Sequence, residues 1–308
     1  MRITRYASLS AVIALAVVAC TAQGQHGISL APDGNPLVVS TSWLASHINS
    51  PSVVVIDVGM WSDKGADTTY AKGHIPGARV IRFGSLVTER DSLDEELPSV
   101  DQIRNALENA GISDSTLVVV YGSDAPAASR ALFTLDYIGH HKFAFLDGGI
   151  AKWRAEGRPL SRDFPAFARG RITPHPNPGL VVTADWITKH AKDPRIALID
   201  TRTDGEYLGT GDRHGMPSEG HIAGARHLEW PLLFESDGMT LKNTAALKKL
   251  YADRVQPGDT VVTYCWVGYR ASMTYFVARD LGYPVKLYDG SYQDWLKRRL
   301  PVRAGAAP

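Results

Sequence analysis

Apolar and β-branched residues in this chain gather in short continuous runs and do not alternate with polar residues. The clearest runs lie at residues 53–56, 118–121, 196–199 and 261–264. Runs of this kind are typical of strands that are buried on both faces of a parallel sheet. Stretches with helical spacing separate the runs, and several of these stretches stop at a glycine. The pattern predicts an α/β fold in which helices flank central parallel sheets.

The same pattern occurs twice along the chain, at an offset close to 143 residues. Residues 53–57 return as residues 196–200, and both runs end in aspartate. The Gly-His-Ile sequence at 73–75 returns at 220–222. Landmarks that recur in a constant order predict two copies of one domain.

Each copy is expected to begin with a tryptophan-containing helix that is capped by a hydroxyl side chain. The cap is Thr41 in the first copy and Thr183 in the second. His74 and His221 occupy equivalent positions in the two copies. A histidine present in both copies favours a structural role in the turn over a catalytic role.

These landmarks define the expected domain organisation. The N-terminal domain covers residues 37–160 and the C-terminal domain covers residues 180–303. Between them, residues 161–179 carry four prolines and are predicted to form a linker. Residues 20–36 are rich in Gly, Pro and Gln and are predicted to form a tether.

Residues 1–19 have the features of a signal peptide of the lipoprotein type. Arginines precede an uncharged apolar run at 7–18, which is too short for a mature membrane-spanning helix. The run leads into a sequence that resembles the bacterial lipobox, which predicts cleavage before Cys20 and lipidation of its thiol. The alternative is ordinary secretory cleavage near Ala19 or Ala22. We therefore expect an exported protein of the bacterial cell envelope or periplasm, bound to the membrane only through its lipid anchor.

Composition narrows the range of partners and cofactors. Lys and Arg total 33 against 32 Asp and Glu, so no strongly charged surface for nucleic acid is expected. The histidines lack the spacing of a metal-ligand set. Cys20 and Cys265 are the only cysteines. If Cys20 is lipidated or removed, no internal disulfide forms, and Cys265 is a candidate reactive thiol.

Cys265 opens a stretch that joins an apolar strand at 261–264 to a helix expected from Ala271. A tight strand-to-helix turn directs backbone N–H groups and a helix N-terminus toward one point, and Arg270 adds a positive charge. A sulfur at that point is stabilised as an anion. The alternative interpretation is a buried structural cysteine.

The first copy serves as an internal control for this assignment. Gly122 stands where Cys265 stands in the second copy, and Ala127 stands where Arg270 stands. The neighbouring Ser123 has no evident base beside it. Only the second copy is therefore predicted to be catalytically active.

Taken together, these motifs resemble the tandem-domain rhodaneses, which are sulfurtransferases that act on thiosulfate or 3-mercaptopyruvate. The resemblance covers about residues 37–303 and rests on residues 70–78, 200–202, 220–222 and 265–270 and on the Asp-Gly turn that closes each copy. It implies two similar α/β domains, each with a central parallel sheet, of which the first is catalytically degenerate and the second is active.

The resemblance also implies roles for individual residues. Cys265 would accept the sulfur, and the residues after it would hold the persulfide: Trp266, Val267, Gly268, Tyr269 and Arg270. Asp200 and Arg202 would face the pocket from a neighbouring strand end, although Asp200 also fits a role in pinning the loop. Many members carry an arginine at the position of Glu206, which leaves the substrate open; Arg213 is the candidate substitute for binding the anion.

The function implied is transfer of a sulfane sulfur by a ping-pong cycle without a cofactor. Thiosulfate is the favoured donor over 3-mercaptopyruvate, and cyanide or a thiol is the expected acceptor. Cys-based phosphatases are a rival class, but they place one residue more between Cys and Arg than the four found here. A non-catalytic surface protein that binds or senses sulfur is the second rival.

Overall fold

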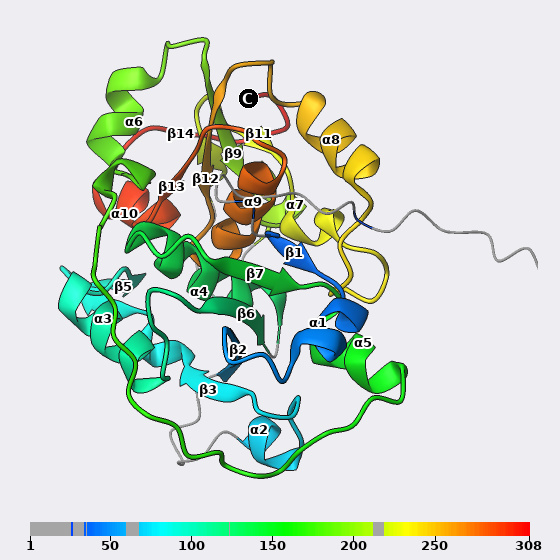
Figure 1. Ribbon diagram of the computed structural model, residues 1–308. Coiled ribbons are helices and arrows are strands. Elements are labelled where there is room, and N and C mark those ends of the chain that lie inside the picture. Colours follow the sequence, from blue (N-terminus) through cyan, green and yellow to red (C-terminus); the bar gives the residue numbers. More distant parts are fainter. Residues whose placement is uncertain (1–25, 27–33, 35, 60–67, 123, 212–218) are drawn as a thin grey trace, which may run out of the picture.

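The computed structural model describes residues 26, 34, 36–59, 68–122, 124–211 and 219–308 (Figure 1). The predicted signal peptide, the lipidation site Cys20 and most of the tether lie outside the described residues. Ser123 and Arg213 also lie outside them, so the roles suggested for these residues stay predictions. Among the helices in the described ranges, none combines the length and the apolar character needed to cross a bilayer.

The first domain is built on a five-stranded parallel sheet with the strand order β1-β7-β6-β2-β3. Its strands are β1 (Val38–Val39), β2 (Val53–Gly59), β3 (Arg79–Arg82), β6 (Leu117–Gly122) and β7 (Phe143–Leu146). The central strands β6 and β2 are the continuous apolar runs of the sequence, and they are buried almost throughout. A strand covered on both faces has no solvent side and therefore no need for alternation.

The second domain repeats this sheet, with the strand order β11-β9-β12-β13-β8 and parallel pairing throughout. Its strands are β8 (Val181–Val182), β9 (Ile196–Asp200), β11 (Arg226–His227), β12 (Thr260–Tyr264) and β13 (Val285–Tyr288). Read from the other edge, the strand order is β8-β13-β12-β9-β11, and each strand then stands at the position of its equivalent in the order β1-β7-β6-β2-β3 of the first domain. The predicted α/β fold with two tandem domains is confirmed.

Helices cover both faces of each sheet. The helices of the first domain are α1 (Thr41–His47), α2 (Thr68–Lys72), α3 (Val100–Asn109), α4 (Ala125–Tyr137) and α5 (Gly149–Ala155). Those of the second are α6 (Ala184–His190), α7 (Asp204–Leu208), α8 (Thr244–Ala252), α9 (Tyr269–Asp280) and α10 (Ser291–Lys297). Helices α1 and α5 share a core with one face of the first sheet, and α6 and α10 do so in the second domain.

Shorter elements complete the two domains. An antiparallel hairpin of β4 (Thr88–Arg90) and β5 (Leu93–Glu96) projects from the first domain. In the second domain, β10 (His221–Ile222) pairs antiparallel with β14 (Val302–Arg303) near the C-terminus. Single 3-10 turns lie at Phe83–Ser85, Pro178–Leu180 and Trp230–Leu233.

The caps of the two tryptophan helices differ from the prediction in one case. Thr183 caps α6 as expected, because its side chain accepts the N–H of Trp186. Thr41 is not the cap of α1: Ser40 accepts the N–H of Trp43 instead. Thr41 lies inside the helix, and its hydroxyl donates to Glu156 at 2.7 Å. The sequence could not distinguish the two residues, because either hydroxyl side chain can cap a helix. The partner of Thr41, Glu156, is remote in sequence.

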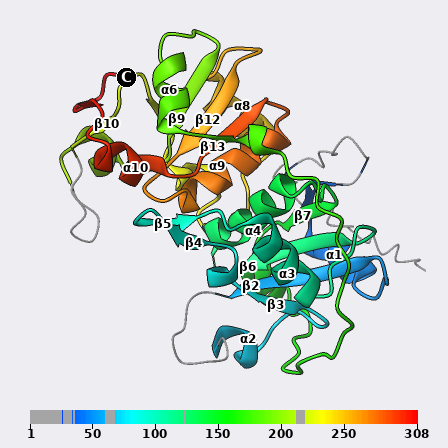
Figure 2. The ribbon, with the colours of Figure 1, turned by 90° about the vertical axis from the view of Figure 1, so that its left-hand side faces the viewer.

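The two domains pack against each other through α4 and α9, which lie side by side between the sheets (Figures 1 and 2). The rings of Phe133 and Tyr275 meet edge to face with centroids 4.9 Å apart. The Tyr275 hydroxyl donates to Asp136 at 2.7 Å, and Arg279 pairs with the same carboxylate. One hydrophobic core cluster contains residues of both domains, so the interface is a continuation of the core.

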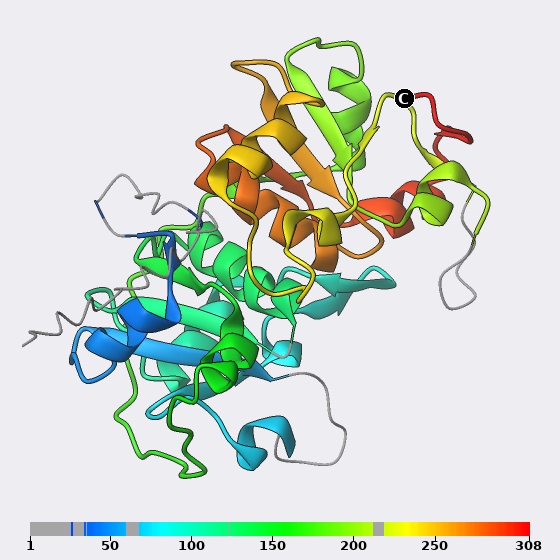
Figure 3. The same cartoon turned by 90° about the vertical axis from the view of Figure 1, so that its right-hand side faces the viewer.

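Residues 161–179 run along the outside of the first domain before the second begins (Figure 3). They are attached to it by backbone bonds from Gly170 N–H to Glu108 and from His175 N–H to Ile138. The Arg79 guanidinium lies over the Phe167 ring at 4.5 Å. The prolines prevent this segment from pairing as a strand with the first domain. It is therefore attached through individual hydrogen bonds and side-chain contacts.

Candidate active site

Cys265 lies at the carboxyl end of β12, the central strand of the second sheet. Its neighbours β9 and β13 end beside it, at Asp200 and at the Asp289–Gly290 turn. The carboxyl edge of a parallel sheet is where open α/β folds bind ligands, because loops diverge there and helix N-termini converge. The first domain has Gly122 at the equivalent strand end, as expected from the repeat.

The helix after Cys265 begins earlier than predicted. The expected start was Ala271, but α9 begins at Tyr269, so Tyr269 and Arg270 belong to its first turn. Gly268 precedes the helix in the left-handed region, with φ of +81°, and this conformation turns the chain directly into the helix. The loop proper therefore spans only residues 265–268.

The backbone N–H groups of Trp266, Val267 and Gly268 donate to no acceptor in the described part of the chain. The first N–H groups of α9 follow directly and also lack intrahelical partners, as at any helix N-terminus. Donors of this kind, together with the helix dipole, favour a negative charge at this point. The Cys265 N–H itself is used elsewhere, since it donates to the Ser291 hydroxyl at 3.3 Å.

The Cys265 side chain has no exposed surface and belongs to the main core cluster of the protein. It forms no disulfide. Cys265 is predicted to be a reactive thiol, but solvent does not reach its sulfur in this conformation. Any ligand reaches Cys265 only after the side chains around it move.

Arg270 does not present a free positive charge to the loop. Its guanidinium makes two hydrogen bonds to the Glu206 carboxylate, at 2.7 and 2.8 Å, and both side chains are buried. Burial lowers the pKa of Arg270, but the bonds to Glu206 and the electrostatic interaction with Cys265 outweigh it and raise the pKa. Burial raises the pKa of Glu206, yet Arg270 and the capping Thr203 lower it to about 2. Glu206, the departure from the family pattern, is thus the partner of the loop arginine.

Asp200 and Arg202 lie at the strand end beside Cys265, as predicted, but they are occupied with each other. Arg202 donates to the Asp200 carboxylate at 2.6 Å and to the Gly220 carbonyl at 2.7 Å. Both side chains are fully buried. The Tyr264 hydroxyl donates to the same Asp200 carboxylate at 2.7 Å. In the described residues only one Arg202 nitrogen, Nη1, lacks a partner, so this cluster holds the loop base together.

The two equivalent histidines have equivalent structural surroundings. His221 contacts the Tyr207 carbonyl through Nδ1 at 2.9 Å and stacks on the Tyr207 ring. His74 makes the same contact with Tyr70 at 2.9 Å and stacks on its ring. The same packing in a copy without the cysteine supports a structural role for both histidines.

The first domain contributes residues that the sequence reasoning missed. The Tyr269 hydroxyl donates to Asp124 of the first domain at 2.5 Å. Arg130 from α4 is fully buried and donates to Asp289 at 2.7 Å, directly behind Gly268. The sequence does contain a signal for Arg130: it is a charged residue in the middle of a helix that is apolar on every side and therefore expected to be buried.

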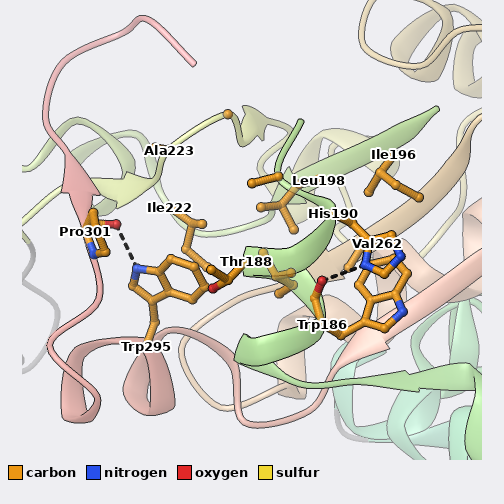
Figure 4. A pocket seen from close by; sticks show the side chains of 13 residues that line it. Trp186, Thr188, His190, Ile196, Leu198, Ile222, Ala223, Val262, Trp295 and Pro301 are labelled. Atoms are coloured by element: carbon orange, nitrogen blue, oxygen red, sulfur yellow. Dashed lines mark hydrogen bonds between the residues drawn. The ribbon is translucent and has the colours of Figure 1, made fainter. Parts of the chain in front are cut away.

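A separate cavity of about 190 Å³ lies in the second domain (Figure 4). Trp186 of α6, Trp295 of α10 and Val262 of β12 contribute to its mostly apolar lining. Cys265 is not part of that lining: it belongs to the core on the α9 side of the sheet, whereas Val262 and Trp295 belong to the core on the α10 side. The cavity is therefore not the site of chemistry at the cysteine. Across the described ranges, no group of three or more His, Cys, Asp or Glu side chains is arranged to hold a metal ion.

Comparison with known proteins agrees with this architecture. The rhodanese-like domain family matches the chain twice, at residues 40–156 and 183–298. The sulfur carrier protein TtuD of Thermus thermophilus is 33% identical over 84% of this chain and 93% of its own length. The thiosulfate sulfurtransferases of Pseudomonas aeruginosa and Rattus norvegicus are each 30% identical, over 84% and 86% of this chain and 94% and 93% of their own.

Solved structures show the same fold. YnjE superimposes with a TM-score of 0.75 at 25% identity, covering 87% of this chain and 68% of that one. Wild-type EanB superimposes with a TM-score of 0.77 at 24% identity, covering 87% of this chain and 69% of that one. With two matching domains, one cysteine at the second strand-to-helix turn and relatives of this identity, the chain belongs to the rhodanese family as a tandem-domain member.

Proposed function

We propose that this protein is a sulfurtransferase that carries a sulfane sulfur on Cys265. In the first half of the cycle, the Cys265 thiolate attacks the outer sulfur of thiosulfate. The S–S bond of thiosulfate breaks, sulfite leaves with the electron pair, and a cysteine persulfide remains. In the second half, cyanide attacks the outer sulfur of the persulfide, thiocyanate leaves, and the thiolate returns.

The observation that carries the proposal is the set of N–H groups at Trp266, Val267 and Gly268 that have no acceptor among the described residues, followed by the N-terminus of α9. They come directly after the strand end that holds the one cysteine of the described chain. Such donors stabilise a sulfur anion without reorganisation during the reaction. In the other domain Gly122 replaces the cysteine on the same scaffold, so the proposal assigns the chemistry to the second domain alone.

Thiosulfate is the donor that we propose over 3-mercaptopyruvate. Several relatives at about this level of identity are named thiosulfate sulfurtransferases. The loop also offers backbone N–H groups in place of free cationic side chains, since Arg270 is paired with Glu206. A compact anion with oxygens on one sulfur suits a short series of consecutive N–H donors, whereas a longer keto acid needs a separate partner for its carboxylate.

The test is mass spectrometry of the intact protein after incubation with thiosulfate. We expect a gain of one sulfur atom, its loss on addition of cyanide with release of thiocyanate, and no gain in Cys265→Ser. An unchanged mass in the folded protein would contradict the proposal and would favour a binding role. Comparing persulfide formation from thiosulfate and from 3-mercaptopyruvate under the same conditions separates the two donors.

A further inference from the structure

The β4–β5 hairpin of the first domain lies beside α10 of the second domain (Figure 2). The backbone of Asp94 exchanges two hydrogen bonds with the Gln293 side chain, at 3.1 and 2.8 Å. The Gln293 N–H in turn donates to the carbonyl of Trp266 at 3.2 Å. The hairpin therefore reaches the loop after Cys265 through a single intervening residue.

Glu95 follows Asp94 in this hairpin and has an unusual conformation. Its φ is +57°, a region that non-glycine residues seldom occupy. Its carbonyl accepts Arg130 Nη2 at 2.8 Å, and Arg130 Nη1 lies 3.3 Å from where a Cβ on Gly268 would be. The Glu95 oxygen Oε2 is buried and has no hydrogen-bond partner in the described chain. A buried, unpaired carboxylate oxygen on a strained residue calls for a functional explanation.

The repeat supplies an internal comparison for this position. Leu97 N–H donates to Asp289 at 2.6 Å, and in the other domain Leu241 N–H donates to Asp147 at 2.8 Å. The two segments are thus equivalent, and Glu95 corresponds to Met239 of the second domain.

The contacts of the Met239 side chain indicate which region lies next to the equivalent residue, Glu95. Its terminal methyl lies 2.7 Å from where a Cβ on Gly149 would be. Gly149 opens α5 as Ser291 opens α10, and the Ser291 hydroxyl accepts the Cys265 N–H. Met239 thus lies against the strand-to-helix end of the first domain, and the equivalent position beside the second domain carries Glu95, a carboxyl group in place of an apolar side chain.

The groups around Glu95 make its charge responsive to pH. Burial raises the pKa of Glu95 to about 6; Arg130 opposes the rise, and Asp94 and Asp124 add to it. Asp124 is also the acceptor of the Tyr269 hydroxyl. Glu96, on the same strand, has a pKa raised by burial and by Asp289, and Arg130 and Arg90 oppose that rise.

We propose that Glu95, contributed by the first domain, is a specificity-determining residue that sets the charge of the sulfur-donor pocket. Ionised, it repels an anionic donor from the N–H groups of the loop; protonated, it admits the donor. This inference rests on the proposed function and adds to it a role for the domain that lacks a nucleophile. The Arg270–Glu206 pair is neutral overall, so no free cation in the described loop offsets the charge of Glu95.

The test is the thiosulfate concentration that gives half-maximal persulfide formation in a single turnover, measured from about pH 5 to about pH 8. Thiosulfate is a dianion throughout this range, so its own charge does not change. We expect that concentration to rise about tenfold with pH in the wild type, because one carboxylate charge acts on a dianion in a partly buried site. In Glu95→Gln it should stay low and change by less than about twofold.

Asp94→Asn and Glu89→Gln are the matched controls, because each removes one negative charge from the same hairpin. Asp94 and Glu89 are exposed, and both variants should keep the pH dependence of the wild type. The proposal is overturned if Glu95→Gln keeps that dependence, or if either control loses it. Any change of the nucleophile's reactivity with pH is common to all variants, so the comparison between variants isolates the effect of Glu95. Absence of persulfide in every variant, wild type included, would instead contradict the proposed function.

Discussion

At the scale of single residues, buried charge pairs flank the candidate active-site loop, and Arg270 belongs to one of them. Arg270 and Glu206 form a buried, doubly hydrogen-bonded pair, and Asp200 and Arg202 form a second pair beside it. Pairs of this kind are weak net contributors to stability, but removing one partner leaves an uncompensated buried charge. The loop therefore depends on both members of each pair.

Glu206→Gln and Arg270→Met should each destabilise the protein by about 3 kcal/mol, because each breaks a buried, doubly hydrogen-bonded charge pair. The double variant should be closer to the wild type than the sum of the two losses. Urea unfolding of the four proteins measures this coupling. Additive losses would mean that the pair does not form in solution.

The Arg270–Glu206 pair also predicts how the stability of the protein changes in acid. Because the pKa of Glu206 is lowered to about 2 from 4.5, its contribution is present above about pH 4.5 and is lost as pH falls toward about 2. The wild type should therefore lose more stability than Glu206→Gln over this interval.

At the scale of elements, the strand-to-helix turn at β12–α9 holds its N–H groups in place through one glycine. Gly268 has φ of +81°, and a Cβ on it would lie 3.0 Å from the Asp289 carbonyl. Left-handed backbone is unfavourable for other residues, and the close carbonyl leaves little room for a side chain. The turn therefore ties the N-terminus of α9 to the turn after β13.

Gly268→Ala should lower the rate of persulfide formation by at least about tenfold, because small displacements of the N–H groups misplace the sulfur. It should also cost about 1–2 kcal/mol of stability. Gly258→Ala is the control, since Gly258 has φ of +87° with nothing within 4 Å of its Cβ position. That variant should lose some stability and retain the rate. Equal rates in the two variants would show that the close contact at Gly268 is unimportant.

At the scale of the whole molecule, the first domain contributes contacts to the candidate active site of the second. Arg130 of α4 holds Asp289 behind the loop, Asp124 holds Tyr269, and the β4–β5 hairpin lies against Asp289. Helices α4 and α9 are buried against each other in a shared core. The second domain therefore does not hold its loop by its own contacts alone.

Arg130→Met should destabilise the protein by about 3 kcal/mol and slow persulfide formation at Cys265, although the change lies in the other domain. The reason is that the buried Asp289 carboxylate loses its counter-charge behind Gly268. The matched control is Arg104→Met, because Arg104 forms an exposed pair with Asp101 and should change stability by less than about 0.5 kcal/mol. Thermal unfolding and the rate of sulfur uptake are the measurements; an unchanged rate in folded Arg130→Met would argue against support across the interface.

The sequence by itself determined the two α/β domains, the parallel sheets and the position of Cys265 at a strand-to-helix turn. These features follow from short-range patterns, namely apolar runs, glycine stops and a repeat that recurs at constant spacing. Local pattern also misplaced two boundaries, since neighbouring hydroxyls compete for the cap at Ser40 and Thr41, and Gly268 starts α9 before Ala271.

Only the tertiary structure decided which charges face the cysteine and how deeply it is buried. Glu206 meets Arg270 across 64 positions of sequence, and Leu97 meets Asp289 across 192. No local pattern encodes such partners, because the first pair depends on how the second domain folds and the second pair depends on how the two domains pack against each other. The Cys265 thiol is buried for the same reason, since the helix that follows it lies between the two domains.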